Sequence, residues 1–412
     1  MRRAAAASLL IAAILIGGGA GQSAPSRTER IHDLFPIMPW EIQPGKQVLL
    51  DEPGHGIESL RACGFNTVAF VRPDQLGEAE KAGMRAIVGR SSDLHVNWRK
   101  MSDRAIFDHV KKVVEASGES DALIGYFLAD EPSAAAFPAL GKAVAAVKQL
   151  APGKLAYINL YPNYARRSQL GTKTYTEYLE RYLTVVKPQF LSYDNYAVQY
   201  SLNLTDRAKG AEYFTNLLQV RRVALRHRLP FWNAVSSNQI RPHTPVPSPA
   251  NLLVQAYTTL AAGARGLTWF TYYAGRYEYA PIDKTGKRTA TWSYLKVVNA
   301  QVKALRPILM RLRSTGVYFT APPPAPGLRR LPGKLVKSIE SPTAVMVGEF
   351  AGEQEERYAM VVNLSLSRSA KVIVRTQAKR VERVSPVDRS LAPLADGDSL
   401  WLPAGQGMLL KL

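Results

Sequence analysis

The chain has 412 residues, one cysteine and a formal net charge of +20 at pH 7. The single cysteine, Cys63, excludes a disulfide within the chain, and its place before Gly64 predicts a small buried residue at a helix end. Lysine and arginine are spread along the chain without a nucleic-acid motif, so we expect a solvated basic surface and no nucleic-acid partner. An anionic glycan remains the alternative partner for this charge.

The chain begins with the pattern of a secretory signal peptide. Met1-Arg2-Arg3 is a basic start, residues 4–16 are almost wholly apolar, and small residues follow up to Ala24. The apolar stretch is short for a membrane span, and no other stretch approaches that length. We therefore expect cleavage of residues 1–24, export to the periplasm or the cell exterior, and no membrane attachment afterwards.

Eight apolar runs rich in β-forming residues follow, with helical patterns between them. They cover residues 35–40, 66–71, 85–88, 124–128, 156–160, 190–193, 230–235 and 266–271. Strands that alternate with helices pair in parallel, and eight such units in about 290 residues fit a TIM barrel. We predict this α/β fold, a (β/α)8 barrel, over residues 30–316. A doubly wound sheet is the alternative, but no glycine-rich phosphate loop follows any strand.

The character of the chain changes at a proline-rich break, Ala321-Pro-Pro-Pro-Ala-Pro-Gly327. After it come short apolar runs at residues 344–350, 358–363 and 371–375, with polar turns between them. Short strands separated by turns are typical of a β-sandwich. We predict a small all-β sandwich over residues 317–412.

The fourth apolar run ends at two adjacent carboxylates, Asp130 and Glu131, which Pro132 follows. Burial of a carboxylate at an apolar strand end is costly unless something compensates. Barrel enzymes keep their catalytic residues at the C-terminal ends of the strands, so Glu131 is a catalytic candidate. The structural alternative is a helix start, with Asp130 as N-cap and Pro132 in the first turn. The two interpretations are compatible.

Aromatic, amide and carboxyl side chains recur at the strand ends. We predict that seven of them bind substrate: Trp40, Asp130, Asn159, Tyr196, Asn233, Trp269 and Tyr272. Aromatic faces stack on pyranose rings, while amides and carboxylates bind hydroxyl groups, so the set predicts a carbohydrate site.

Glycoside hydrolysis needs two carboxyl groups. We assign Glu131 as the proton donor, with a pKa raised by burial or by a like charge. Asp194 interrupts the sixth apolar run, and we assign it as nucleophile or base. The alternative for Asp194 is a structural carboxylate that accepts backbone N–H groups. Glu41 and Glu278 are weaker candidates.

Other chemistries have less support in the sequence. The six histidines form no pair with metal-ligand spacing, and no Gly-x-Ser-x-Gly motif is present. We therefore predict no metal and no cofactor.

Four stretches together resemble exported bacterial TIM-barrel glycoside hydrolases, in the large clan that includes β-galactosidases and cellulases. They cover residues 125–132, 157–163, 191–196 and 255–272. The resemblance implies that a glutamate at the end of strand four is the acid/base, and Glu131 matches that position. It also implies a nucleophile glutamate at the end of strand seven, where residues 231–237 contain no carboxylate.

These observations favour a glycoside hydrolase that cleaves an oligo- or polysaccharide with two carboxylates. A catalytically silent glycan-binding barrel is the alternative, and the missing strand-seven carboxylate favours it. The buried character expected for Glu131 argues against it, because binding alone needs no perturbed acid. A third hypothesis, a polysaccharide lyase, would need a Tyr or Lys base near an arginine. Arg72, Arg90 and the many tyrosines leave this hypothesis open, but no motif supports it. The sequence leaves the sugar and the oligomeric state open.

Overall fold

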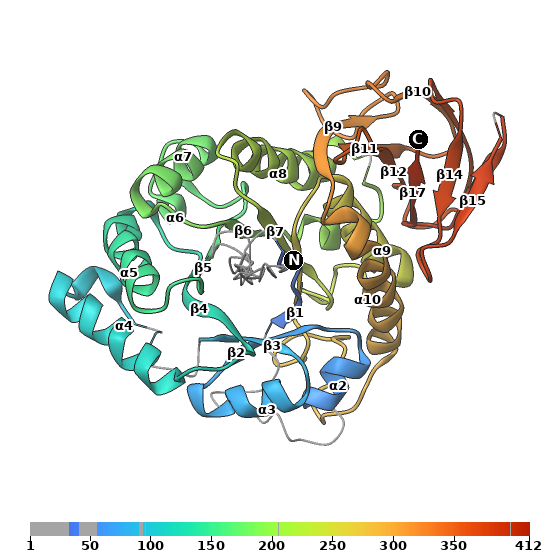
Figure 1. Cartoon of the computed structure of the whole chain (residues 1–412). Helices are drawn as coiled ribbons and strands as arrows, with labels where there is room; N and C mark the ends of the chain where they lie inside the picture. Colours follow the sequence, from blue (N-terminus) through green and yellow to red (C-terminus); the bar gives the residue numbers. More distant parts are fainter. Residues whose placement is uncertain (1–32, 41–55, 90–93, 95, 205, 396) are drawn as a thin grey trace, which may run out of the picture.

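The computed structural model describes the chain in six stretches, which are residues 33–40, 56–89, 94, 96–204, 206–395 and 397–412. The predicted signal peptide and Glu41 lie outside them. Eight parallel strands form a barrel, and helices surround it in a ring (Figure 1). The strands follow the order β1-β8-β7-β6-β5-β4-β3-β2, and β1 contacts β2 to close the barrel.

All eight predicted strands are present, with ends that differ by at most two residues from the predicted ones. They are β1 Ile37–Trp40, β2 Thr67–Val71, β3 Arg85–Val88, β4 Leu123–Asp130, β5 Leu155–Leu160, β6 Leu191–Asp194, β7 Phe231–Ser236 and β8 Gly266–Phe270. The main helices are α2 Ile57–Ala62, α3 Leu76–Lys81, α4 Asp103–Ser117, α5 Phe137–Leu150, α6 Arg167–Leu170, α7 Tyr175–Val186, α8 Arg207–Arg226, α9 Pro249–Ala261 and α10 Ala290–Leu309. No helix in the described stretches is long and apolar enough to cross a membrane.

Large aromatic side chains fill the inside of the barrel. The Phe70 and Phe127 rings stack with centroids 4.0 Å apart, and the Trp40 ring meets Phe70 edge-on at 4.9 Å. Tyr157 and Trp232 continue the cluster, with ring centroids 5.5 Å apart. A second apolar layer lies between the strands and the helices. The barrel is thus a packed core and not an open pore.

The C-terminal region forms two antiparallel sheets, as predicted. One contains β10 Val336–Glu340, β13 Ala370–Thr376 and β16 Ser399–Leu402. The other contains β9 Arg313–Phe319, β11 Val345–Ala351, β12 Arg357–Asn363, β14 Val381–Val384, β15 Leu391–Leu394 and β17 Gly407–Lys411. Strand β9 belongs to this sheet and begins at Arg313, four residues before the predicted start of the region at residue 317.

The larger β sheet lies directly against helix α9 of the barrel. A Cβ atom placed on Gly348 of β11 would lie 2.0 Å from the carbonyl oxygen of Ala261. Only glycine fits at such a distance, so the backbone of β11 touches the end of α9. The two regions therefore share a closely packed interface.

Glu349, next to this contact, holds the loop before β10 in place. Its side chain is 0 % exposed, and it accepts backbone N–H bonds from Lys334, Leu335 and Val336 at 3.0, 2.8 and 2.9 Å. Glu349→Gln turns one acceptor into a donor that faces these N–H groups. We expect it to lower the free energy of unfolding by about 2 kcal/mol. Denaturant unfolding measures this, with the exposed Glu353→Gln as control. An equal stability of the two variants would contradict the role.

Candidate active site

Strand β4 ends in a sharp turn that aims its two carboxylates. Asp130 is the last residue of the strand and is exposed. Glu131 has a φ of 44°, in the left-handed region that is uncommon for a glutamate, and its N–H donates to the carbonyl of Asn159 at 2.8 Å. The alternation of strand side chains therefore ends at Asp130, and Glu131 turns toward strand β6. Such conformations cost free energy and are frequent in functional sites.

Asn159, at the end of β5, links the carboxylates at the ends of β4 and β6, the two strands on either side of it. Its Nδ2 donates to Oδ1 of Asp130 and to Oδ1 of Asp194, each at 3.2 Å. Its Oδ1 accepts from the hydroxyl of Ser192 at 3.0 Å. Both amide hydrogens of Asn159 are therefore engaged. Asn159, predicted to bind substrate, thus bridges Asp130 and Asp194 by hydrogen bonds.

Asp194, at the end of β6, is 1 % exposed and hydrogen-bonded to Glu131. Burial, together with the charges of Glu131 and Asp130, raises the pKa of Asp194 well above its ordinary value. A hydrogen bond between two carboxyl groups needs a proton on one of them. The raised pKa favours the protonated form of Asp194, in which its carboxyl group can donate to Glu131.

The environment of Glu131 makes it a suitable proton donor. Burial and the charge of Asp130 raise its pKa to about 7, while the hydrogen bond from Asp194 acts in the opposite direction. A general acid is most effective when its pKa lies near the working pH. Glu131 and Asp194, assigned as a pair from the sequence, are thus in contact. No group of three or more His, Cys, Asp or Glu within the described stretches is arranged to hold a metal ion.

Aromatic side chains border this carboxyl cluster. The Tyr196 ring stacks on Phe270 at 5.0 Å, and its backbone N–H donates to the hydroxyl of Tyr164 at 3.2 Å. Burial and the nearby charges of Asp194 and Asp130 raise the pKa of the Tyr196 phenol well above its usual value. Tyr196, predicted to bind substrate, is therefore beside the carboxylates. Tyr164 and Phe270 were missed, although each follows or ends a barrel strand.

Three predicted binding residues, Asn233, Trp269 and Tyr272, point away from the mouth of the barrel, and for these the prediction is corrected. Each is completely buried and hydrogen-bonded to a side chain of the outer layer. The partners are Thr259 on α9 at 2.8 Å, Asn299 on α10 at 2.9 Å and Ser59 on α2 at 2.8 Å. Alternation along a strand explains Asn233, because its neighbour Trp232 faces the interior.

Trp40 and Glu278 are also not brought to the carboxyl cluster. Trp40 is 4 % exposed and packs inside the barrel against Phe70 and Phe127, so it contributes to the core. The Glu278 side chain is exposed and pairs with Lys284, with Nζ 2.5 Å from Oε1. The contacts of Trp40 and of Glu278 are therefore made with residues other than Glu131.

The outward position of Trp269 can be tested by its effect on stability. Trp269→Phe removes the donor to Asn299 and leaves a buried acceptor and a small void. We expect the free energy of unfolding to fall by about 2 kcal/mol. The KM for a substrate should stay unchanged, because the side chain does not reach the mouth. Thermal unfolding and steady-state kinetics measure both, and a large rise in KM with unchanged stability would contradict the placement.

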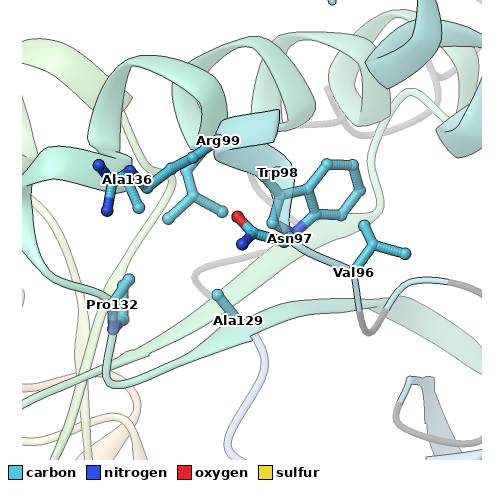
Figure 2. Close-up of a pocket in the computed structure, with 8 residues that line it drawn as sticks. Val96, Asn97, Trp98, Arg99, Ala129, Pro132 and Ala136 are labelled. Carbon is cyan, nitrogen blue, oxygen red and sulfur yellow. The ribbon is translucent and has the colours of Figure 1, made fainter. Parts of the chain in front are cut away.

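Two pockets lie outside the carboxyl cluster. One of about 400 Å³ is beside the Pro132 turn, between β4 and the short helix η2 Trp98–Lys100 (Figure 2). Its wall includes Trp98, whose indole N–H donates to the carbonyl of Leu128 at 2.9 Å, and Ala129. The other, of about 730 Å³, is at the N-terminal ends of the strands and contains Arg85 and Lys154. In barrel enzymes that end is associated with stability.

No protein-family model matches the chain, and no curated protein matches it in sequence. Solved structures do match. The β-galactosidase from Bacillus circulans sp. alkalophilus aligns with a TM-score of 0.61 and 8 % identity, over 86 % of this chain and 96 % of its own. A family 5 glycoside hydrolase from Bacteroides vulgatus aligns with a TM-score of 0.53 and 10 % identity, over 86 % and 84 %.

A third match is the β-galactosidase from the psychrophilic Marinomonas ef1, with a TM-score of 0.47 and 11 % identity. It covers 63 % of this chain, and this chain spans 60 % of that protein. At such identities the likeness concerns the fold. The chain thus has the barrel fold of glycoside hydrolases, in agreement with the resemblance noted in the sequence.

Proposed function

We propose that the protein is a glycoside hydrolase that cleaves O-glycosidic bonds of an oligo- or polysaccharide, with Glu131 as the proton donor. The observation that carries the proposal is the position of Glu131. It directly follows the fourth strand of a glycoside-hydrolase-like barrel, has a pKa of about 7, and is bordered by stacked aromatic rings. The predicted signal peptide supports action outside the cytoplasm.

In this mechanism Glu131 transfers its proton to the glycosidic oxygen while the bond from that oxygen to C1 breaks. The resulting carboxylate then accepts a proton from the water that adds at C1. Asp130 and the Tyr196–Phe270 pair would bind the sugar around C1. The raised pKa of Glu131 keeps a large share of it protonated near neutral pH.

The contact between Asp194 and Glu131 favours a role for Asp194 other than the nucleophile or base assigned from the sequence. Carboxyl pairs that attack or activate across a sugar are roughly 5 Å apart in retaining enzymes and 6.5–9.5 Å apart in inverting ones. Asp194 is 1 % exposed and its carboxyl group adjoins that of Glu131, so it does not face a sugar from the side opposite to the acid. We propose that Asp194 is a positioning residue that orients Glu131 and tunes its pKa.

A catalytically silent glycan-binding barrel is the second candidate. In the described residues β7 ends without a carboxylate, and its polar side chains bond to the protein itself. Ser237 Oγ donates to the carbonyl of Thr271 at 3.0 Å, and Asn238 Nδ2 donates to that of Phe270 at 3.0 Å. A protein that only binds sugar would gain nothing from two carboxyl groups with raised pKa values, which is why hydrolysis is preferred.

The two candidates separate in one experiment. Wild type and Glu131→Gln are incubated with aryl glycosides and with plant and bacterial polysaccharides, and released sugar is measured. Release by the wild type alone would support the hydrolase. No release from the whole panel, together with sugar-dependent tryptophan fluorescence in both proteins, would support the binding barrel.

The pKa of Glu131 also predicts the pH dependence of hydrolysis. Because the protonated form is the active one, kcat/KM should fall about tenfold per pH unit above pH 7. Asp130→Asn removes a charge that raises this pKa, so the falling limb should move to lower pH. Rate profiles measured from pH 4 to 10 in constant ionic strength test this, and a limb unmoved by Asp130→Asn would contradict the assignment.

A further inference from the structure

We infer that Tyr178 of helix α7 is a positioning residue for the proton donor. Its hydroxyl group fixes the turn after strand β4 in the shape that directs Glu131 toward strand β6. This inference rests on the proposed function, because it adds a residue to the acid step of the same site.

The backbone of Glu131 has a conformation that the local sequence does not favour. Its φ is 44°, in the left-handed region, where a residue with a Cβ atom is strained. Pro132 follows, and the residue before a proline normally adopts an extended conformation with a negative φ. Both effects favour a straight continuation of β4 over the observed turn. Contacts from other elements must therefore hold Glu131 in place.

Two hydrogen bonds hold the backbone on either side of Glu131. Its own N–H donates to the carbonyl oxygen of Asn159 at 2.8 Å, which ties the turn to strand β5. One residue later, the Tyr178 hydroxyl donates to the carbonyl oxygen of Pro132 at 2.7 Å, which ties the turn to helix α7. The first bond joins two backbone groups. The second depends on a single side-chain hydroxyl, so a substitution can remove it.

The Tyr178 ring is itself held in place. The side chain is completely buried. Its ring stacks on that of Tyr175, one turn earlier in α7, with centroids 5.9 Å apart, and the Phe137 ring at the start of α5 lies 5.2 Å from it. Closely packed rings have little freedom to move. The hydroxyl is therefore a fixed point to which the turn is attached.

The turn also packs against the segment that leads into α7. A Cβ atom placed on Gly171, the residue after helix α6, would lie 2.6 Å from Oγ of Ser133. Glycine, with a φ of 69° here, permits this close approach. The contact keeps the turn beside α7 when the Tyr178 hydroxyl is removed, so we expect the variant to fold and to lose the exact orientation of Glu131.

The acid step is sensitive to such a loss. A general acid must lie within hydrogen-bond reach of the oxygen that it protonates. A misplacement of about 1 Å, even from a change outside the reacting groups, can cost roughly 10²-fold in rate. Because Tyr178 is completely buried, it acts on the reaction through the turn and not by contact with the sugar.

The test is Tyr178→Phe, which removes the hydroxyl and keeps the ring. On glycosides with poor leaving groups, kcat/KM should fall by roughly tenfold to 10²-fold. On 2,4-dinitrophenyl glycosides, whose leaving group needs no proton, it should change little. The difference between the two substrate types is the decisive result, since a general weakening of the fold would lower both rates alike.

Tyr182→Phe is the matched control, because it makes the same change one turn further along α7. Tyr182 is also buried, and its ring lies 5.4 Å from that of Phe137. We expect its rates to match the wild type on both substrate types. Thermal unfolding of both variants sets an assay temperature at which each is folded.

A double variant tests whether Tyr178 acts through Glu131. Glu131→Gln has no proton to deliver, so orientation of this side chain no longer matters for the acid step. Adding Tyr178→Phe to Glu131→Gln should therefore lower kcat/KM by less than about twofold. Independent effects would instead multiply.

The outcomes are separable. Equal losses on the two substrate types, multiplied losses in the double variant, or wild-type rates in Tyr178→Phe would each overturn the inference and leave the proposed function standing. Wild-type rates in Glu131→Gln alone, or no hydrolysis of any glycoside by the wild type, would contradict the proposed function and the inference with it.

Discussion

Replacing Glu131 with glutamine is expected to lower kcat by roughly 10²–10⁴-fold on substrates with poor leaving groups. Glutamine has nearly the same size but no acidic proton, so the glycosidic oxygen would leave as an alkoxide. With 2,4-dinitrophenyl glycosides, whose leaving group needs no proton, the loss should be much smaller. Comparison of kcat on both substrate types isolates the acid role.

The matched control for this variant is Glu278→Gln, a carboxyl-to-amide change at an exposed position. Glu131→Gln should bind sugar as well as the wild type, as measured by tryptophan fluorescence. A Glu131→Gln protein that hydrolyses natural glycosides at the wild-type rate would eliminate Glu131 as the acid. An equal loss on activated and natural substrates would point to misfolding or to another role.

Asp194 is expected to respond in opposite ways to two substitutions. Asp194→Asn keeps a donor toward Glu131 and an acceptor for Asn159, as the protonated form of the aspartate does. Its kcat/KM should stay within about tenfold of the wild type, the value of one ordinary hydrogen bond. Asp194→Ala removes both bonds and leaves Glu131 without its orienting contact. A loss of roughly 10²-fold is expected from such misplacement.

This pair of variants discriminates between positioning and nucleophilic catalysis. If Asp194 attacked C1, asparagine and alanine would both abolish turnover, because neither can form the covalent bond. Turnover that survives in Asp194→Asn therefore supports the positioning role. Thermal unfolding is measured in parallel, since Asp194→Ala also opens a small void in a fully buried site.

The barrel could be predicted from sequence because apolar runs and helical periodicity are local patterns that repeat eight times. The direction of side chains at the strand ends is not local. A shift in the pairing of β4 with β5 lies between Phe127 and Ala129, and Glu131 adopts a left-handed φ two residues later. The alternation of side chains along a strand therefore does not predict where Asp130 and Glu131 point.

The same limit applies to the residues predicted to bind sugar. Trp269 and Tyr272 are aromatic residues near a strand end, as a sugar platform requires, but helices α2 and α10 supply partners that keep them in the outer layer. Their partners come from residues 30 or more positions away, which no strand pattern reveals. Glu131 was found because a carboxylate pair after an apolar run is unusual by itself.

The role of Asp194 depended on its neighbours in space. Its sequence context indicates only a carboxylate at a strand end. Its raised pKa follows from burial and from the charges of Glu131 and Asp130, which lie at the end of another strand. The sequence singled out Glu131 and Asp194 as a pair, and the structure places the two carboxyl groups next to each other. How the two groups act on one another could be proposed only from the folded arrangement.

The contact of Gly348 with Ala261 bears on the modularity of this architecture. Helix α10 ends at Leu309 and β9 begins at Arg313, so only three residues separate the barrel from the sheet that rests on it. Accessory domains that recombine freely between enzymes are joined to them by flexible linkers. In this protein the larger β sheet packs against helix α9, with the backbones of β11 and α9 in contact. Replacing the barrel or the sheet by that of another protein would expose this packed surface. The two regions are expected to have been inherited as one unit.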